Sequence, residues 1–228
     1  MSDKQKRSWD RPEGATLKQW MDSRVAHRST RTYDWNALKF QTEVDPKYGR
    51  AQMRYIGTGG TGVSGDTNSV PAEHFTFSTM ILPAGHEGPL HIHYDVEEVF
   101  FVLRGTVKMI AESADGKEKW EAIVKERDLI SWPPGVYRGE INIGDEEALM
   151  LVMLGAAKPE TPTYPPHDPL AKAKRTLKST AAARAHAAAS GLAIAYACGD
   201  IAGMGLAGAD LVTAMEGIEH VADKPAFV

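Results

Sequence analysis

Apolar and polar positions alternate with a period of two over residues 51–154, in short runs separated by turn residues. Successive side chains of a strand point to opposite faces, so this pattern predicts an all-β sandwich or barrel. Asp115-Gly116 lies between two alternating runs and predicts a hairpin turn. The expected strands cover residues 52–56, 74–82, 90–93, 98–104, 106–111, 120–124, 129–132, 137–143 and 148–154.

Helical spacing replaces this alternation near the N-terminus. Leu17, Trp20, Met21 and Val25 recur at the spacing of one helix face, and Thr16 can cap the first turn. We therefore expect a short helix within residues 16–27. It belongs to an N-terminal arm, residues 1–50, which precedes a β-barrel over residues 51–157.

The character of the chain changes twice after the barrel. Frequent prolines predict an extended linker over residues 158–169. Residues 170–228 are rich in Ala and Gly and predict a helical extension. Residues 191–215 are long enough to cross a bilayer, but they include Asp200 and Asp210. An aspartate near the bilayer centre costs about 3 kcal/mol, so we expect no membrane span.

Composition narrows the classes of function. The chain has 228 residues, a net charge of −4 and no evident basic face, so we expect no nucleic-acid partner. Cys198 is the only cysteine, which excludes an internal disulfide and a cysteine-based metal cluster. The first residues are hydrophilic and lack the apolar core of a signal peptide, so we expect a cytoplasmic location.

The candidate chemistry lies in one short stretch. His91 and His93 are two residues apart, so in a strand both imidazoles point to one face. A bend at residues 94–96 would bring Glu98 back to them. Two imidazoles and a carboxylate suit a divalent transition metal with open coordination positions, typically iron, with manganese, nickel or zinc as alternatives. The competing interpretation is an exposed strand end that binds nothing.

The strand that starts at Glu98 also bears on assembly. If Glu98 faces inward, then Val99, Phe101 and Leu103 face outward and form an apolar outer surface. Such a surface needs a cover, which the arm, the C-terminal extension or a second subunit could supply. We expect a homodimer, because two-fold assemblies dominate among soluble oligomers.

The same stretch resembles the first sequence motif of the cupin superfamily. That motif is a glycine, five residues, His-x-His, four residues, a glutamate, six residues and a glycine. Gly85, His91, His93, Glu98 and Gly105 occupy its five fixed positions. The resemblance implies a single-domain cupin, that is, a double-stranded β-helix or jelly-roll barrel. It also implies that the two histidines and the glutamate are metal ligands.

The second cupin motif is only partly present, and the resemblance as a whole covers about residues 75–154. Pro133, Gly135 and Asn142 match in register, while Arg127 replaces the leading glycine. Arg138 occupies the position of a histidine that is normally the fourth protein ligand in this family.

Arg138 leaves three possibilities open, because a guanidinium has no acceptor and cannot ligate a metal. The first motif could hold the metal alone, with Arg138 binding an anionic substrate. Arg138 could instead pair with Glu98, and no metal would bind. Alternatively, Glu140, Tyr137 or His86 could replace the missing ligand.

The sequence therefore predicts a metal-dependent cupin enzyme for a small organic acid or phenolic compound, and more specifically a dioxygenase-type oxidoreductase. Arg138 and Glu140 are the candidate catalytic residues, and the substrate is expected to be a small anionic molecule. The alternative is a metal-free cupin that binds or senses a small molecule. A third possibility is an assembly scaffold, because one fold hosts many activities.

Overall fold

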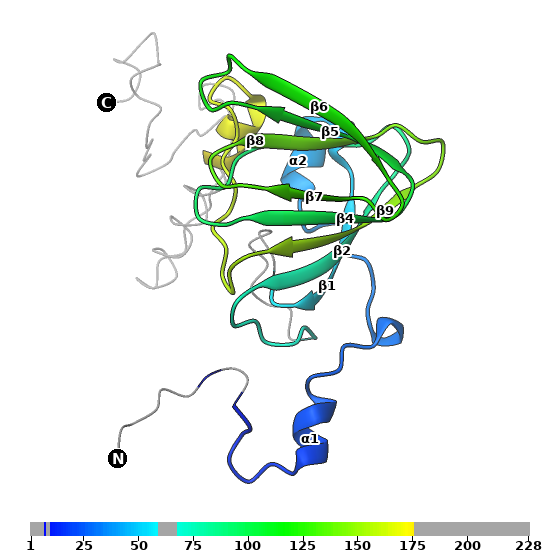
Figure 1. Ribbon diagram of the computed structural model, residues 1–228, viewed down its shortest axis with the longest axis vertical. Helices are drawn as coiled ribbons and strands as arrows, with labels where there is room; N and C mark the ends of the chain where they lie inside the picture. The colour runs from blue at the N-terminus through cyan, green and yellow to red at the C-terminus, as the bar shows by residue number, and fades with distance from the viewer. Residues whose placement is uncertain (1–6, 8–9, 59–67, 176–228) are drawn as a thin grey trace, which may run out of the picture. The chain divides into compact units, whose positions relative to one another are not determined.

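The computed structural model describes residue 7 and residues 10–58 and 68–175. Within these residues, nine strands form two antiparallel sheets (Figure 1). The five-stranded sheet has the order β1-β2-β9-β4-β7 and the four-stranded sheet the order β3-β8-β5-β6. The strands are β1 (Ala51–Ile56), β2 (Thr76–Leu82), β3 (Glu87–His91), β4 (Glu98–Arg104), β5 (Thr106–Glu112), β6 (Lys119–Lys125), β7 (Leu129–Trp132), β8 (Tyr137–Asn142) and β9 (Ala148–Leu154).

Alternating burial explains why the two sheets pack together. Every second residue of β2 and of β9 is buried, so each strand has one apolar face. Neighbouring strands are often far apart in sequence, as where β2 pairs with β9, which gives the wrapped order of a jelly roll. The expected all-β jelly-roll barrel is thus confirmed. Its core contains Met80, Leu82, Phe100, Val102, Val107, Met109, Val124, Trp132, Ala148, Met150 and Val152.

The strand that carries the first histidine differs from its predicted bounds. We expected residues 90–93, whereas β3 ends at His91. Its register with β8 shifts between Gly88 and His91, around Pro89, which has no N–H to donate. Ile92 then pairs with Thr163, so the chain stays extended as far as His93.

Several turns adopt left-handed backbone conformations. Gly116 has φ +73° in the β5–β6 hairpin, and its N–H bonds to the Ser113 carbonyl, as the Asp115-Gly116 turn requires. Gly85 and Gly105 of the first motif have φ +73° and +98°. Arg127, at the second motif's leading position, has φ +72° and is the only described non-glycine residue with positive φ. The turn is thus retained although its usual glycine is replaced.

The N-terminal segment begins with α1 (Leu17–Asp22), which is shorter than expected. Thr16 caps it as predicted, because its side chain accepts the Gln19 N–H while Gln19 bonds back to the Thr16 backbone. No residue of α1 is buried, and Leu17 and Met21 remain 59% and 49% exposed. A short 3₁₀ turn, η1 (Arg28–Thr30), follows.

The second half of this segment packs against the chain that follows the barrel. It comprises α2 (Lys39–Val44) and the 3₁₀ turn η2 (Pro46–Tyr48). Phe40 and Tyr48 pack against a small apolar cluster of Tyr164, Leu170 and Ala171. The segment that precedes the barrel in the sequence and the segment that follows it therefore pack against each other.

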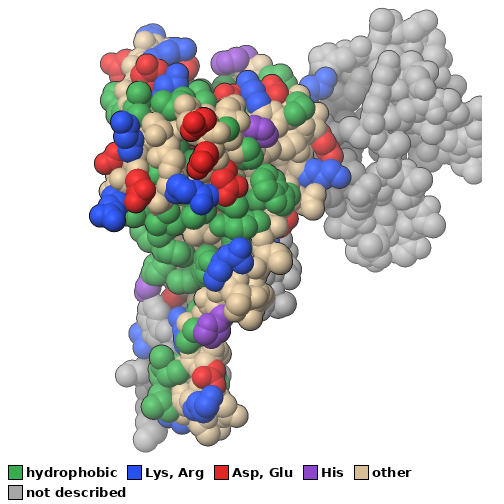
Figure 2. All heavy atoms as spheres, turned by 90° about the vertical axis from the view of Figure 1, so that its right-hand side faces the viewer, with side chains coloured by type: hydrophobic (Ala, Val, Ile, Leu, Met, Phe, Trp, Pro, Cys, Tyr) green, Lys and Arg blue, Asp and Glu red, His purple; other side chains and the backbone are tan. Residues whose placement is uncertain are grey.

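The described chain ends with helical residues 169–175. Most of the predicted C-terminal extension, including residues 191–215, lies outside the described residues. Within the described part, we find no helix with the length and apolarity needed to cross a bilayer. On the face shown in Figure 2, Lys and Arg side chains are interspersed with Asp and Glu.

Candidate metal centre

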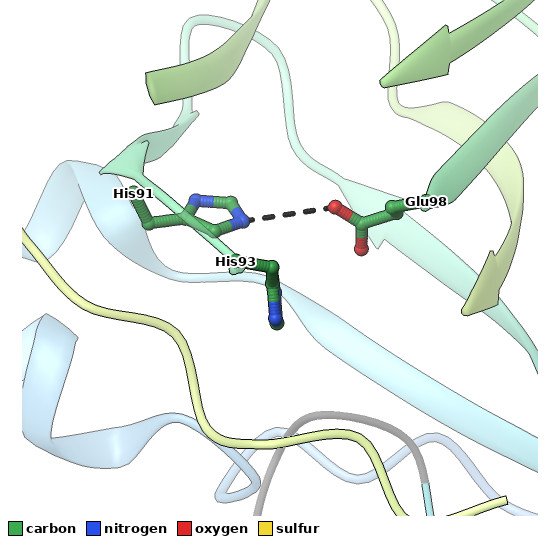
Figure 3. Close-up of side chains that lie close together, drawn as sticks. All are labelled: His91, His93 and Glu98. Atoms are coloured by element: carbon green, nitrogen blue, oxygen red, sulfur yellow. Dashed lines mark ion pairs between the residues drawn. The ribbon is translucent and has the colours of Figure 1, made fainter. Parts of the chain in front are cut away.

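The structure brings His91, His93 and Glu98 together. His91 ends β3, His93 lies just beyond it, and Glu98 begins β4 after a bend at residues 94 and 95 (Figure 3). All three side chains are buried, and one potential ligand atom from each lies within 4.8 Å of the others. The bend expected at residues 94–96 is what returns the glutamate to the histidines.

The orientation of His91 suits a metal ligand. Its Nδ1 lies 2.8 Å from the Pro89 carbonyl oxygen. A carbonyl can only accept, so Nδ1 carries the proton and donates, which leaves the lone pair on Nε2. Nε2 faces Oε2 of Glu98 at 3.8 Å. In its neutral form, His91 would therefore turn a lone pair toward Oε2 across a gap in which a cation would be stabilised.

His93 completes the set with a neutral ring. The two imidazole centroids are 5.5 Å apart at an interplanar angle of 80°. Burial lowers the pKa of His93 to about 4, so its ring is uncharged at neutral pH, the state that metal ligation requires. Its Nδ1 is buried and has no hydrogen-bond partner among the described residues.

Glu98 is held as a carboxylate. Burial by itself would raise its pKa, but the approach of His91 and the positive charge of Arg138 together lower it to about 2. Nε of Arg138 donates to Oε2 of Glu98 at 2.7 Å. This bond uses one carboxylate oxygen, and it realises the pairing that was one of the three possibilities for Arg138.

Arg138 is a residue of β8, where it lies opposite His91 in the β3–β8 register, and its side chain lies beside that of Glu98. Its side chain is fully buried, and Nη1 and Nη2 have no hydrogen-bond partner within the described chain. It is not among the residues that line the cavity next to the three candidate ligands. Its contacts thus point to Glu98 more than to a molecule in the cavity.

His86 and Glu140, two of the proposed replacement ligands, are not part of this three-residue group. His86 is half-buried, and its Nδ1 lies 2.7 Å from the Gly49 carbonyl oxygen. Glu140 is buried on β8 and lies outside the three-residue group. Burial raises the pKa of Glu140, and the positive charge of Arg50 offsets only part of this effect. Among the described residues, the candidate ligands at this centre are therefore His91, His93 and Glu98.

A cavity of about 50 Å³ lies next to this centre, between the two sheets. Its walls include the three candidate ligands, Glu140, and residues that the sequence did not single out, notably Arg50 and Gln41. Leu38, Gln52, Ser78, Met80, Phe100, Val152, Leu154 and Pro162 complete the lining. Arg50 and Gln41 had been assigned to the arm, and no local pattern marks them as parts of a pocket.

A larger hollow of about 620 Å³ lies between the N-terminal segment and β1. Arg31, Asp34, Trp35 and Arg54 contribute to its walls, but none of the three candidate ligands does. Size alone therefore does not identify the functional site, and the smaller cavity is the one that adjoins the candidate metal ligands.

Residues 78–154 match the family model of the cupin domain. This part of the chain is a cupin domain, which confirms the resemblance seen in the sequence motifs. The domain accounts for β2 to β9, apart from the first residues of β2, whereas Arg50 and Gln41 precede it.

Solved structures are similar to this chain at low identity. Recombinant oxalate oxidase in complex with glycolate is 19% identical, with 51% of this chain aligned to 55% of that chain and a TM-score of 0.41. The formate complex of Lactobacillus farciminis oxalate decarboxylase is 15% identical over 59% and 33% of the two chains, with a TM-score of 0.44. Peruvianin-I, a cysteine peptidase from Thevetia peruviana latex, is 14% identical over 66% and 80%, with a TM-score of 0.47.

The chain thus spans about half the length of the first of these structures. Among curated proteins, none matches this sequence.

Proposed function

We propose that this protein is a metal-dependent cupin enzyme that acts on a small anionic organic acid or phenolic compound, as a dioxygenase-type oxidoreductase. The observation that carries the proposal is the convergence of His91, His93 and Glu98 beside a cavity. Two imidazoles and an ionised carboxylate fit a divalent transition metal, with iron favoured over manganese, nickel or zinc. When bound, such a metal would supply Lewis-acid polarisation or activation of oxygen.

In this proposal, Arg138 is a positioning residue. Its hydrogen bond to Oε2 fixes the carboxylate of Glu98, and its charge keeps that carboxylate ionised. The same charge would oppose a neighbouring cation, so the site must balance the two effects. An anionic substrate would reduce this repulsion.

Glu140 is the candidate general acid or base. Its carboxyl group lines the cavity, and Oε2 has no hydrogen-bond partner among the described residues. Burial raises its pKa, so the group can exchange a proton closer to neutral pH than an exposed glutamate does. Met80 and Phe100 line the same space and make part of its wall apolar.

A second candidate function is a metal-free module that binds or senses a small molecule. The ion pair between Arg138 and Glu98 favours it, because Arg138 supplies a positive charge where the family usually places a metal ligand. Metal binding separates the two candidates directly.

The test is metal analysis of untagged, full-length protein. The enzyme proposal predicts about one equivalent of iron, manganese, nickel or zinc per chain, because the three ligands form one site. His91→Ala should abolish loading, while His167→Ala, at an exposed histidine outside the site, should not. A wild-type protein that holds less than about a tenth of an equivalent, and does not rebind metal, would favour the metal-free module.

We further propose a homodimer and a cytoplasmic location. Leu103 is 39% exposed on β4, and Val99 and Phe101 on the same face are half-buried. A second subunit would cover this apolar face. Light scattering that gives the mass of a single chain would contradict the dimer.

A further inference from the structure

Arg50 is a buried arginine whose hydrogen bonds are only partly satisfied. Its side chain is 6% exposed and lines the cavity beside the candidate ligands. Nη1 donates to Oε1 of Gln41 at 2.7 Å and to the Tyr48 carbonyl at 3.2 Å, which fixes the plane of the guanidinium. Nε is also buried, but it has no acceptor among the described residues.

Glu140 lies close to Arg50, yet it does not accept a hydrogen bond from the Nε atom of Arg50. Oε1 of Glu140 lies 3.9 Å from Nε of Arg50, which is too long for a hydrogen bond. Oε2 of Glu140 is also buried and has no partner in the described chain. An unsatisfied buried charged group carries a large free-energy cost, so a donor and an acceptor left open in one cavity indicate a missing ligand group.

The chemistry of the two groups defines what would fit. An arginine N–H binds a carboxylate oxygen through a charge-assisted hydrogen bond. Because burial raises the pKa of Glu140, its carboxyl group retains a proton at higher pH than usual and can then donate to the same carboxylate. The cavity volume of about 50 Å³ corresponds to roughly three to five water-sized groups. This is the size of a carboxylic acid with two or three carbons.

We propose that Arg50, with Glu140 beside it, binds the carboxylate of a small aliphatic carboxylic acid and directs the rest of the molecule toward His91, His93 and Glu98. The inference rests on the proposed function for its role in substrate recognition, and it names the class of substrate. The binding step itself needs no metal. Arg50 precedes the cupin domain, so this recognition element is supplied by a segment outside it.

The test uses the full chain, with and without chelator treatment, and a matched pair of probes. Propionate and propionamide have nearly the same shape, but only propionate carries a charge. Calorimetry should show that the wild type binds propionate at least about tenfold more tightly than propionamide, as a charge-assisted bond implies. Arg50→Gln should remove this preference, and Arg50→Lys should retain part of it.

Arg54→Gln is the control for losing a buried arginine. Arg54 lies on β1, is 9% exposed and pairs with Asp34 away from the cavity. Its variant should keep the preference for propionate. Metal content of Arg50→Gln should equal that of the wild type, because Arg50 is not one of the three candidate ligands.

Three results would overturn the inference: no binding of propionate by the wild type, equal binding of the acid and the amide, or an unchanged preference in folded Arg50→Gln. If Arg50→Gln does not fold, the wild-type preference and Arg50→Lys decide. If the wild type binds no metal but prefers propionate in an Arg50-dependent way, the enzyme proposal is refuted and the carboxylate inference is supported. If the wild type is fully loaded with metal but shows no preference for propionate, the carboxylate inference is refuted and the enzyme proposal is supported.

Discussion

Gly88 and Glu140 face each other across the β3–β8 pair, and the space above Gly88 is occupied by the glutamate's carboxylate. A Cβ atom on Gly88 would lie 1.8 Å from Oε1 of Glu140. The glycine is therefore what allows a buried carboxyl group to lie at this point of the cavity wall.

Gly88→Ala should displace Glu140 and destabilise the fold. Overpacking of a filled interior costs about 1–3 kcal/mol, so we expect a loss of that size in the free energy of unfolding. Gly155→Ala is the control, because a Cβ there would meet its nearest atom, the Glu97 carbonyl oxygen, at an ordinary 3.5 Å. Urea unfolding measures both variants, and equal stability losses would contradict the expected role of Gly88.

Arg127→Gly should stabilise the protein. Arg127 has φ +72°, a conformation that costs a non-glycine residue roughly 1–2 kcal/mol. The greater freedom of glycine in the unfolded chain takes back part of the gain, so the free energy of unfolding should rise by about 0.5–1 kcal/mol. Glu126→Gly, next to it but without positive φ, should lower stability in the same unfolding assay. A loss of stability in Arg127→Gly would show that the turn is not strained.

Arg138→His should strengthen metal binding. The substitution removes a positive charge beside Glu98 and restores an imidazole at the family's fourth ligand position. We expect metal affinity to rise about tenfold or more, measured by competition with a chromogenic chelator. The metal-free alternative predicts that metal binding appears only in this variant. Arg54→His, which changes a buried arginine away from the site, should leave affinity unchanged.

Tyr164→Phe should loosen the contact between the two segments that flank the barrel. The side-chain amide of Gln41 donates to the Tyr164 hydroxyl, and both residues are buried. Loss of this bond should lower the free energy of unfolding by about 1 kcal/mol. Faster amide hydrogen exchange should be confined to α2 and residues 162–171. Tyr94→Phe, at a tyrosine that is 63% exposed, is the control and should change neither quantity.

The strands were largely predictable, because alternating burial is a local property of the chain. The predicted bounds of β4, β7 and β9 agree with the structure, and the motif that joins His91, His93 and Glu98 is equally local. The bounds of β3 were wrong because the register shift between Gly88 and His91 depends on the pairing with β8.

Contacts between distant parts of the chain could not be read from the sequence. The bond between Gln41 and Tyr164 joins residues 123 positions apart, and only the fold brings them together. The proposed role of Arg50 depends on the same long-range contact, because the Gln41 side chain that bonds to Tyr164 also accepts a hydrogen bond from the Arg50 guanidinium. For Arg138, the sequence left three alternatives, and the structure shows the pairing with Glu98.

The cavity takes its walls from two sources, the cupin domain and the segments on either side of it, which supply Leu38, Gln41, Arg50, Gln52 and Pro162. Substitutions in the flanking segments can therefore alter which molecule is accepted while leaving the histidines and Glu98 untouched. Under the proposed function, chains that keep the same three candidate ligands would differ in ligand preference through these borders alone.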